Sequence, residues 1–431
     1  MALIRRQNGV AAVSRPKSAR LLALALLLAA LACEPPVPED PAPAATVRDS
    51  ANIEIVENHA PARDTAGFWT VGPEPEFVIG GYRGASEAVD DPAHLVWQVG
   101  GAALLSDGRV AVLSRGVAKV LVFETSGALS ASFGGKGQGP GEFSSPLHLQ
   151  VLPRDTIVVW DYMFGRISRF DPSGALLGER SIDVGAVFAA TRTVDQRPTE
   201  SVALPLPDGT FLVEINRTDF RPTLDTYYRV PAGYARIDSD YGAQSFGWWD
   251  GQEFLLARLP IPYLLPFRTE AVLAAGGSPL SVYISEGDEY EVHQFSPMGT
   301  LRRIIRRTEV EPIPITSADV EAWKARLSEG QTLDWQGWDG VMAKNPPRPF
   351  RPRVAGLLTD TEGNLWVANR LDSSTSEWSV FDSEGRWLGT LDLPLPHITW
   401  LGKDLVLGVQ RDPDTGVETV EGYRVNRGLS R

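Results

Sequence analysis

The sequence predicts an all-β fold assembled from one repeated unit. A motif of Phe, three turn-like residues and Gly recurs at Phe123–Gly127, Phe170–Gly174, Phe295–Gly299 and Phe381–Gly385, with a looser copy at Ile237–Gly242. Each copy is typical of a strand that ends in a tight turn, where Gly adopts a positive φ. With 431 residues, 41 Gly and 33 Pro, the chain is long enough for one large repetitive domain with many turns.

Six short β-rich runs mark the repeats. They are Val110–Ser114, Ile157–Asp161, Phe211–Ile215, Ser281–Ser285, Leu365–Asn369 and Leu405–Val409. Three of the five intervals between their starts lie between 40 and 54 residues, the length of a four-stranded propeller blade. The other two are longer, which indicates insertions. We therefore expect a six-bladed β-propeller of four-stranded antiparallel blades over residues 51–431.

The two ends of the propeller are expected to pair. The last repeat contains the runs His397–Leu401, Leu405–Val409 and Gly422–Val425, one strand fewer than a complete blade. Phe77-Val-Ile-Gly-Gly81 parallels Ala131-Ser-Phe-Gly-Gly135, the end of the fourth strand in the first blade. Phe77–Ile79 is therefore predicted to complete the last blade and remove two exposed sheet edges. Residues 34–70 should then be mainly tether and lead-in, and dispensable for folding.

A helical insertion is expected at about residues 311–353, between blades 4 and 5. Thr316 or Ser317 would cap the helix, and Val320, Trp323 and Leu327 share one face at a spacing of three and four. A helix between blades lies on one face of a propeller, where it could roof the central opening.

One repeat resembles a known family. It contains Phe133-Gly-Gly-Lys-Gly-Gln-Gly-Pro-Gly-Glu-Phe143, Pro146, Ile157-Val-Val-Trp-Asp161, Arg166 and Phe170-Asp-Pro-Ser-Gly174, which together are similar to an NHL repeat. The resemblance implies that Asp161 and Arg166 tie neighbouring strands of the blade together. Phe164 replaces the family's usual Asn, and blade 1 has Ser114 and Lys119 at the Asp and Arg positions. The whole chain looks like the bacterial six-bladed propeller lipoproteins of the TolB-like superfamily.

The first 32 residues are typical of a secretory signal. Basic residues precede an apolar run, Leu21–Ala32, that is shorter than the roughly 20 residues of a membrane span. Cys33 follows this run directly and is the only cysteine, so the region resembles a lipobox with Cys33 as the lipidated residue. Ordinary secretion with a free thiol is the alternative. Residues 33–50 would form a Pro-rich tether, and the protein would face the periplasm, in the outer membrane.

The charge of the chain argues against nucleic acid as a partner. The net charge is −13, and it becomes −18 once five basic residues leave with the signal peptide. Such a chain repels phosphate backbones. We expect a monomer that contacts the membrane through its lipid only and binds an envelope protein or a small ligand.

Candidate functional residues are few. No GxSxG elbow, HxH or HxxxH spacing occurs, so no cofactor is predicted. The pairs Trp248/Trp249 and Trp335/Trp338 fall in the longer repeats and are candidates for a binding surface, although tryptophan in propellers often packs between blades. The expected function is a binding or interaction module. The alternative is a propeller enzyme similar to lactonases and lyases, with a divalent metal on the axis and Asp161 and Asn369 as possible ligands.

Overall fold

The computed structural model describes the chain from residue 43 to residue 427 with several gaps. The described residues are 43–62, 68–81, 96–162, 165–182, 196–206, 208–217, 222–240, 242–257, 263, 265–328, 334–372, 374–412 and 415–427. The predicted signal peptide, Cys33 and most of the tether lie outside them. All that follows concerns the compact unit Ala44–Arg431.

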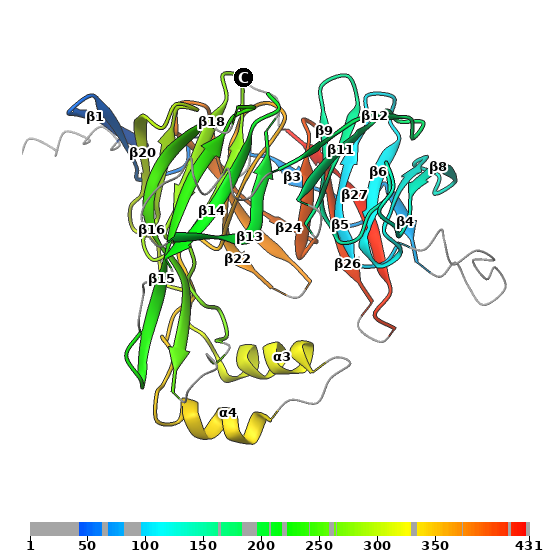
Figure 1. Ribbon diagram of the computed structural model, residues 1–431. Coiled ribbons are helices and arrows are strands. Elements are labelled where there is room, and N and C mark those ends of the chain that lie inside the picture. Colours follow the sequence, from blue (N-terminus) through cyan, green and yellow to red (C-terminus); the bar gives the residue numbers. More distant parts are fainter. Residues whose placement is uncertain are drawn as a thin grey trace, which may run out of the picture. The chain divides into compact units, whose positions relative to one another are not determined.

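Six sheets follow one another along this unit, and each is one blade (Figure 1). Blade 1 comprises β5 (Val99–Leu104), β6 (Val110–Ser114), β7 (Lys119–Phe123) and β8 (Leu129–Gly134), and blade 2 comprises β9 (Pro146–Leu152), β10 (Thr156–Asp161), β11 (Arg166–Phe170) and β12 (Leu176–Ser181). Blade 3 comprises β13 (Gln196–Pro205), β14 (Phe211–Arg217), β15 (Thr226–Ile237) and β16 (Ala243–Leu256), and blade 4 comprises β17 (Val272–Gly276), β18 (Ser281–Ser285), β19 (Glu291–Phe295) and β20 (Leu301–Arg307). Blade 5 comprises β21 (Gly356–Thr359), β22 (Leu365–Leu371), β23 (Ser376–Phe381) and β24 (Trp387–Leu393), and blade 6 begins with β25 (His397–Leu401), β26 (Leu405–Arg411) and β27 (Glu418–Asn426).

The repeat motifs have the positions that the sequence predicted. The six β-rich runs are the second strands of the six blades. The four Phe residues of the turn motif end the third strands of blades 1, 2, 4 and 5, and the Gly of each motif has a φ between 75° and 92°. The six-bladed fold of four-stranded antiparallel sheets is therefore confirmed.

The blades close into a ring through shared hydrophobic cores. Each pair of consecutive blades shares one buried cluster, and blade 6 shares another with blade 1. One pair of residues can stand for each cluster. Starting with the cluster between blades 1 and 2 and going around the ring, the pairs are Leu113 with Phe143, Trp160 with Phe211, Phe246 with Val282, Tyr290 with Leu365, Trp366 with Ile398, and Val420 with Val110. The first strands of neighbouring blades contact one another, as β5 contacts β9 and β25, so these strands are innermost.

The strand that completes blade 6 comes from the N-terminal part of the chain, as predicted. β4 (Phe77–Gly80) pairs antiparallel with β27, with Ile79 opposite Val420. β3 (Thr70–Val71) pairs with a different part of β27, at Val425 and Asn426. The closing strand thus joins residues that are more than 300 positions apart in the sequence.

The segment before Phe77 is not the simple lead-in that we expected. β1 (Ala45–Ser50) lies within the predicted tether and pairs with β2 (Ile53–Asn58), which adds in parallel to β20 of blade 4. Buried Asn58 donates through Nδ2 to the carbonyls of Arg306 and Gly385 and accepts the N–H of Trp387 at 2.8 Å. Further along, Phe68 and Trp69 belong to the core shared by blades 5 and 6. The chain needs this segment because it covers an edge of blade 4 and fills a gap between later blades.

The insertion contains two helices where the sequence predicted one. α3 (Ser317–Leu327) begins with a capping box in which Thr316 and Asp319 satisfy each other's backbone N–H groups. α4 (Trp335–Met342) begins at Asp334, whose carboxylate accepts the N–H of Gly337. In the described part of the chain, no helix is both long and apolar enough to cross a bilayer.

The insertion packs against an extension of blade 3. β15 and β16 are longer than the strands of other blades, and Figure 1 shows their ends reaching toward α3 and α4. The accessory cluster, as we call this contact, has buried members from both regions: Leu255, Leu265, Trp323, Trp338, Val341 and Met342. The two longer repeats in the sequence therefore belong to one structural feature.

Candidate functional site: an axial pocket

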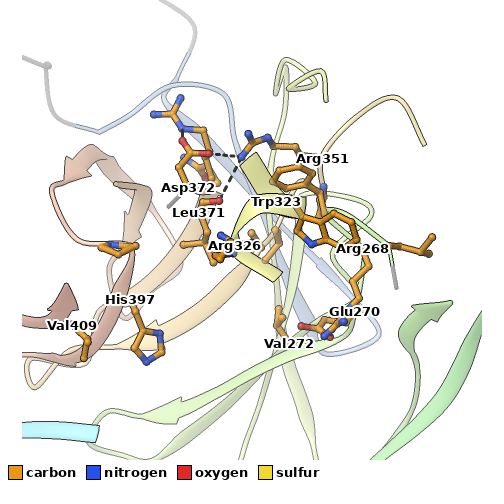
Figure 2. A pocket seen from close by; sticks show the side chains of 18 of the residues that line it. Arg268, Glu270, Val272, Trp323, Arg326, Arg351, Leu371, Asp372, His397 and Val409 are labelled. Atoms are coloured by element: carbon orange, nitrogen blue, oxygen red, sulfur yellow. Dashed lines mark hydrogen bonds and ion pairs between the residues drawn. The ribbon is translucent and has the colours of Figure 1, made fainter. Parts of the chain in front are cut away.

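A cavity lies where the innermost strands meet the insertion. Its volume is about 610 Å³, within the range of small-molecule sites. It is lined by residues of four blades, such as Val99, Val272, Leu371 and His397, and by Trp323 of α3. Figure 2 shows His397 and Val409 at one side of this axial pocket and Trp323, Arg268 and Glu270 at the other. The insertion, which we expected to roof the central opening, contributes Trp323 and Arg326 to the wall of this pocket.

Arginine is the main charged residue of the pocket wall. The lining includes five guanidinium groups, those of Arg268, Arg326, Arg351, Arg370 and Arg411. Three carboxylates also line it, those of Glu270, Asp372 and Glu418. A lining with more arginines than carboxylates contrasts with a chain whose net charge is −13.

Arg351 is held in place through both of its terminal nitrogens. Its side chain is only 7% exposed and lies between Asp319 of α3, at 2.8 Å, and Asp372, at 2.6 Å. Its guanidinium also covers the ring of Phe267 at 4.2 Å. Figure 2 shows the contacts of Arg351 with Leu371 and Asp372 as dashed lines. Two charge-assisted contacts and a cation–π contact hold this corner of the pocket rigid and join the insertion to blade 5.

His397 lies on the opposite side, at the start of β25. The side chain of His397 is accessible to solvent, but the surrounding pocket walls partly desolvate the imidazole, which lowers the pKa of His397, and the negative charge of Glu418 opposes this shift only in part. The imidazole is therefore neutral at pH 7. Glu418 also accepts the backbone N–H of Val99 at 2.7 Å, so that it joins blade 6 to blade 1 beside the pocket.

Trp335 and Trp338 do not form the exposed surface that we expected. Trp338 is 8% exposed, and its ring lies 5.6 Å from that of Trp323 and 5.9 Å from that of Trp335. The indole N–H of Trp335 donates to Ser328 Oγ at 2.7 Å. These tryptophans are the core of the insertion, because two short helices must bury an apolar face of their own.

Trp248 and Trp249 lie in strand β16, between two register shifts in its pairing with β15. Trp249 packs edge-on against Phe295 of blade 4 and beside His293, so it belongs to the packing between blades. Trp248 is 42% exposed, but adjacent strand residues alternate in direction, so the two side chains do not form a paired surface.

Asp161 and Asn369 are engaged in hydrogen bonds. Asp161 accepts the backbone N–H groups of Ser144 and Ser145 at 2.6 and 3.1 Å, while Arg166 donates to the carbonyl of Glu142. Both residues of the NHL-like pair therefore hold the connection that leads into blade 2.

Asn369 lines the axial pocket, but its amide is saturated. Its oxygen accepts from Tyr290, and its nitrogen donates to Glu377 and Ser379. Asp161 is not part of the pocket lining. Among the described residues, no group of three or more His, Cys, Asp or Glu side chains is arranged to hold a metal ion.

The sequence did not predict the arginines of the pocket, because they are scattered between residues 268 and 411. A usable signal was the basic, Pro-rich return of the insertion, Asn345–Arg353, with its three arginines. The arginines that line the pocket come together only when the ring of blades closes and the insertion packs beside it.

Comparisons with known proteins agree with the six-bladed fold. A family model described as a 6-bladed beta-propeller, DUF5128, matches residues 100–196. No functionally curated protein matches the sequence. Solved structures that are similar include a candidate exported protein of Bacteroides fragilis NCTC 9343, with 13% identity over 87% of this chain and 99% of that chain and a TM-score of 0.41. A member of the duf4221 family from Bacteroides vulgatus has 9% identity, coverage of 84% and 99%, and a TM-score of 0.44. A gluconolactonase from Xanthomonas campestris has 14% identity, coverage of 83% and 98%, and a TM-score of 0.39.

Proposed function

We propose that this propeller is a lipid-anchored, extracytoplasmic binding module that takes up a small ligand in its axial pocket. The observation that carries the proposal is the pocket of about 610 Å³, whose wall combines apolar side chains with fixed polar groups. Ligand sites in proteins have this composition and size. The chain acts as a monomer, and its acidic character disfavours nucleic acid as a partner.

The pocket, rather than the tryptophan pairs, is the better candidate for binding. Trp249, Trp335 and Trp338 are used in packing within the protein. The pocket wall, by contrast, is built from rigid strands and from Arg351, which is held by two carboxylates. A rigid wall lowers the entropy that binding would otherwise cost.

The alternative function, a metal-dependent propeller enzyme, has less support. Its two suggested ligands, Asp161 and Asn369, each use their oxygen atoms for hydrogen bonds within the protein. Neither side chain offers a free oxygen in this arrangement.

A substitution that fills the pocket tests the proposal. His397 is exposed at the pocket wall, so His397→Trp should occlude the cavity without disturbing a packed core. We expect at least one compound class in a panel of sugars, amino acids, carboxylates and sugar phosphates to raise the melting temperature of the wild type. Ligand at 100 times Kd adds about 2.7 kcal/mol of stability. His397→Trp should abolish this rise.

The matched control is His59→Trp, at an exposed histidine that does not line the pocket. It should respond to ligand as the wild type does. A wild type that responds to no class, or a His397→Trp variant that responds fully, would contradict ligand binding in the axial pocket.

A further inference from the structure

Arg326 places a positive charge at the pocket wall. It lies in the last turn of α3, is exposed, and lines the cavity. Its side chain has no hydrogen-bond or ion-pair partner among the residues that the structure describes. Arg326 is therefore available for an anion that enters the pocket.

A second guanidinium group on the same side is partly exposed. Arg268 lies 3.5 Å from Glu270 and donates to the amide oxygen of Gln252, and its side chain is 36% exposed. Arg351 uses both terminal nitrogens for Asp372 and Asp319, so it shapes the wall and leaves the ligand contacts to the more exposed arginines. A guanidinium presents five N–H donors and no acceptor, so donors left over in a cavity favour an anionic ligand.

Two of the three carboxylates of the pocket, Asp372 and Glu418, already have close partners, and the third, Glu270, lies 3.5 Å from Arg268. Asp372 is shared by Arg351 and Arg370, with an oxygen 2.6 Å from the first and 2.9 Å from the second. Glu418 accepts the N–H of Val99. These acids orient arginines and backbone and do not offer a site for a cation. The charged groups of the wall that remain available are therefore cationic, and they favour an anionic ligand.

Another part of the wall is apolar. It is lined by aliphatic side chains of blades 4, 5 and 6 and of the segments that lead into them, namely Leu265, Val272, Val354, Pro396 and Val409. An inorganic ion would leave this surface in contact with water only. Burial of an apolar body there would contribute about 25 cal/mol for each Å² removed from water.

Resting on the proposed function, we propose that the axial pocket binds an amphipathic organic anion. Its carboxylate or phosphate group would contact Arg268 and Arg326, beside Trp323, and its apolar body would lie along the aliphatic wall. Figure 2 shows both arginines and Trp323 at the same side of the pocket.

Two fluorescent probes with one ring system separate charge from apolar shape. 1-Anilinonaphthalene-8-sulfonate carries an anionic group, and N-phenyl-1-naphthylamine has the same rings without it. We expect the wild-type domain to bind the anionic probe at least about tenfold more tightly, the factor that corresponds to 1.4 kcal/mol. Arg326→Gln and Arg268→Gln should each weaken the anionic probe severalfold and leave the neutral probe unchanged.

Arg302→Gln is the matched control, because Arg302 is exposed on β20 and does not line the pocket. It should bind both probes as the wild type does. Competition by 1-naphthoate and by 1-naphthyl phosphate then shows whether a carboxylate or a phosphate is preferred.

The outcomes separate this inference from the proposed function. One outcome is that both probes bind the wild type with equal affinity, that His397→Trp abolishes the binding of both, and that the arginine variants leave both affinities unchanged. In that case the pocket binds ligands but does not select anions. If His397→Trp affects neither probe, the probes bind elsewhere and the proposed function fails together with the inference.

Discussion

At the scale of single residues, most of the tryptophans that the sequence suggested for binding are used for packing inside the protein. Trp323, Trp335 and Trp338 contact one another in the accessory cluster, and Lys324 lies 5.0 Å from the ring of Trp338. Trp248 remains exposed because the neighbouring Trp249 takes the inward direction on β16. Burial, rather than residue type, therefore distinguishes a structural tryptophan from a surface one.

The double substitution Trp335→Ala with Trp338→Ala should accordingly loosen the insertion. Loss of a buried indole costs about 3–5 kcal/mol because it leaves a cavity. The inter-blade clusters do not contain these residues, so we expect faster hydrogen exchange in residues 311–353 while the blades stay protected. Trp248→Ala, at the exposed tryptophan, is the control and should change little. Unchanged exchange in the double variant would show that the helices do not depend on this packing.

At the scale of elements, the N-terminal strands complete two different blades. β2 extends blade 4, and Asn58 at its end ties blade 4 to the turn of blade 5. β4 is the outer strand of blade 6. The two strands make separate contributions, because one covers an edge and the other closes the ring.

Graded truncations should separate these contributions. Deletion of residues 34–43 should leave the melting temperature unchanged, since β1 begins at Ala45. Deletion of 34–58 should lower it, because β2 and the buried amide of Asn58 are lost, and unsatisfied buried groups cost about 1–3 kcal/mol each. Deletion of 34–81 should lower it further, since Phe68, Trp69 and β4 leave the cores of blades 5, 6 and 1.

Thermal denaturation of the three truncations decides the assignment. If the first two melt together, the β1–β2 hairpin is dispensable, as the sequence alone had suggested. If the second and third melt together, β4 does not hold the ring closed.

At the scale of the whole molecule, location and binding are separable properties. The predicted lipid anchor is at Cys33, outside the described residues, whereas the pocket is built entirely from residues 99–418. Cys33→Ser should therefore release the protein from the membrane fraction and leave its melting temperature and its binding of the probes unchanged. Fractionation after a high-salt wash measures this. A variant that stays with membranes would contradict lipidation at Cys33.

The sequence by itself determined the fold, because each blade is a local repeat. A strand-ending Phe, a turn and a Gly at positive φ depend on neighbours only a few residues away, and so they recur visibly. The strand that closes blade 6 was also predictable, since Phe77–Gly81 copies a motif within blade 1. The same local chemistry predicted the N-cap of α3 at Thr316 or Ser317, and the structure has it at Thr316.

Only the tertiary structure decided the site. Arg268, Arg326, Arg351 and His397 are far apart in the chain and share no motif, and they meet because six blades close around one axis and an insertion folds beside it. The β1–β2 hairpin likewise carries no blade motif, and its place on blade 4 depends on an edge supplied by residues almost 250 positions away. Long-range contacts of this kind leave no periodic signal in a single sequence, because each is set by the shape of surfaces that exist only after folding.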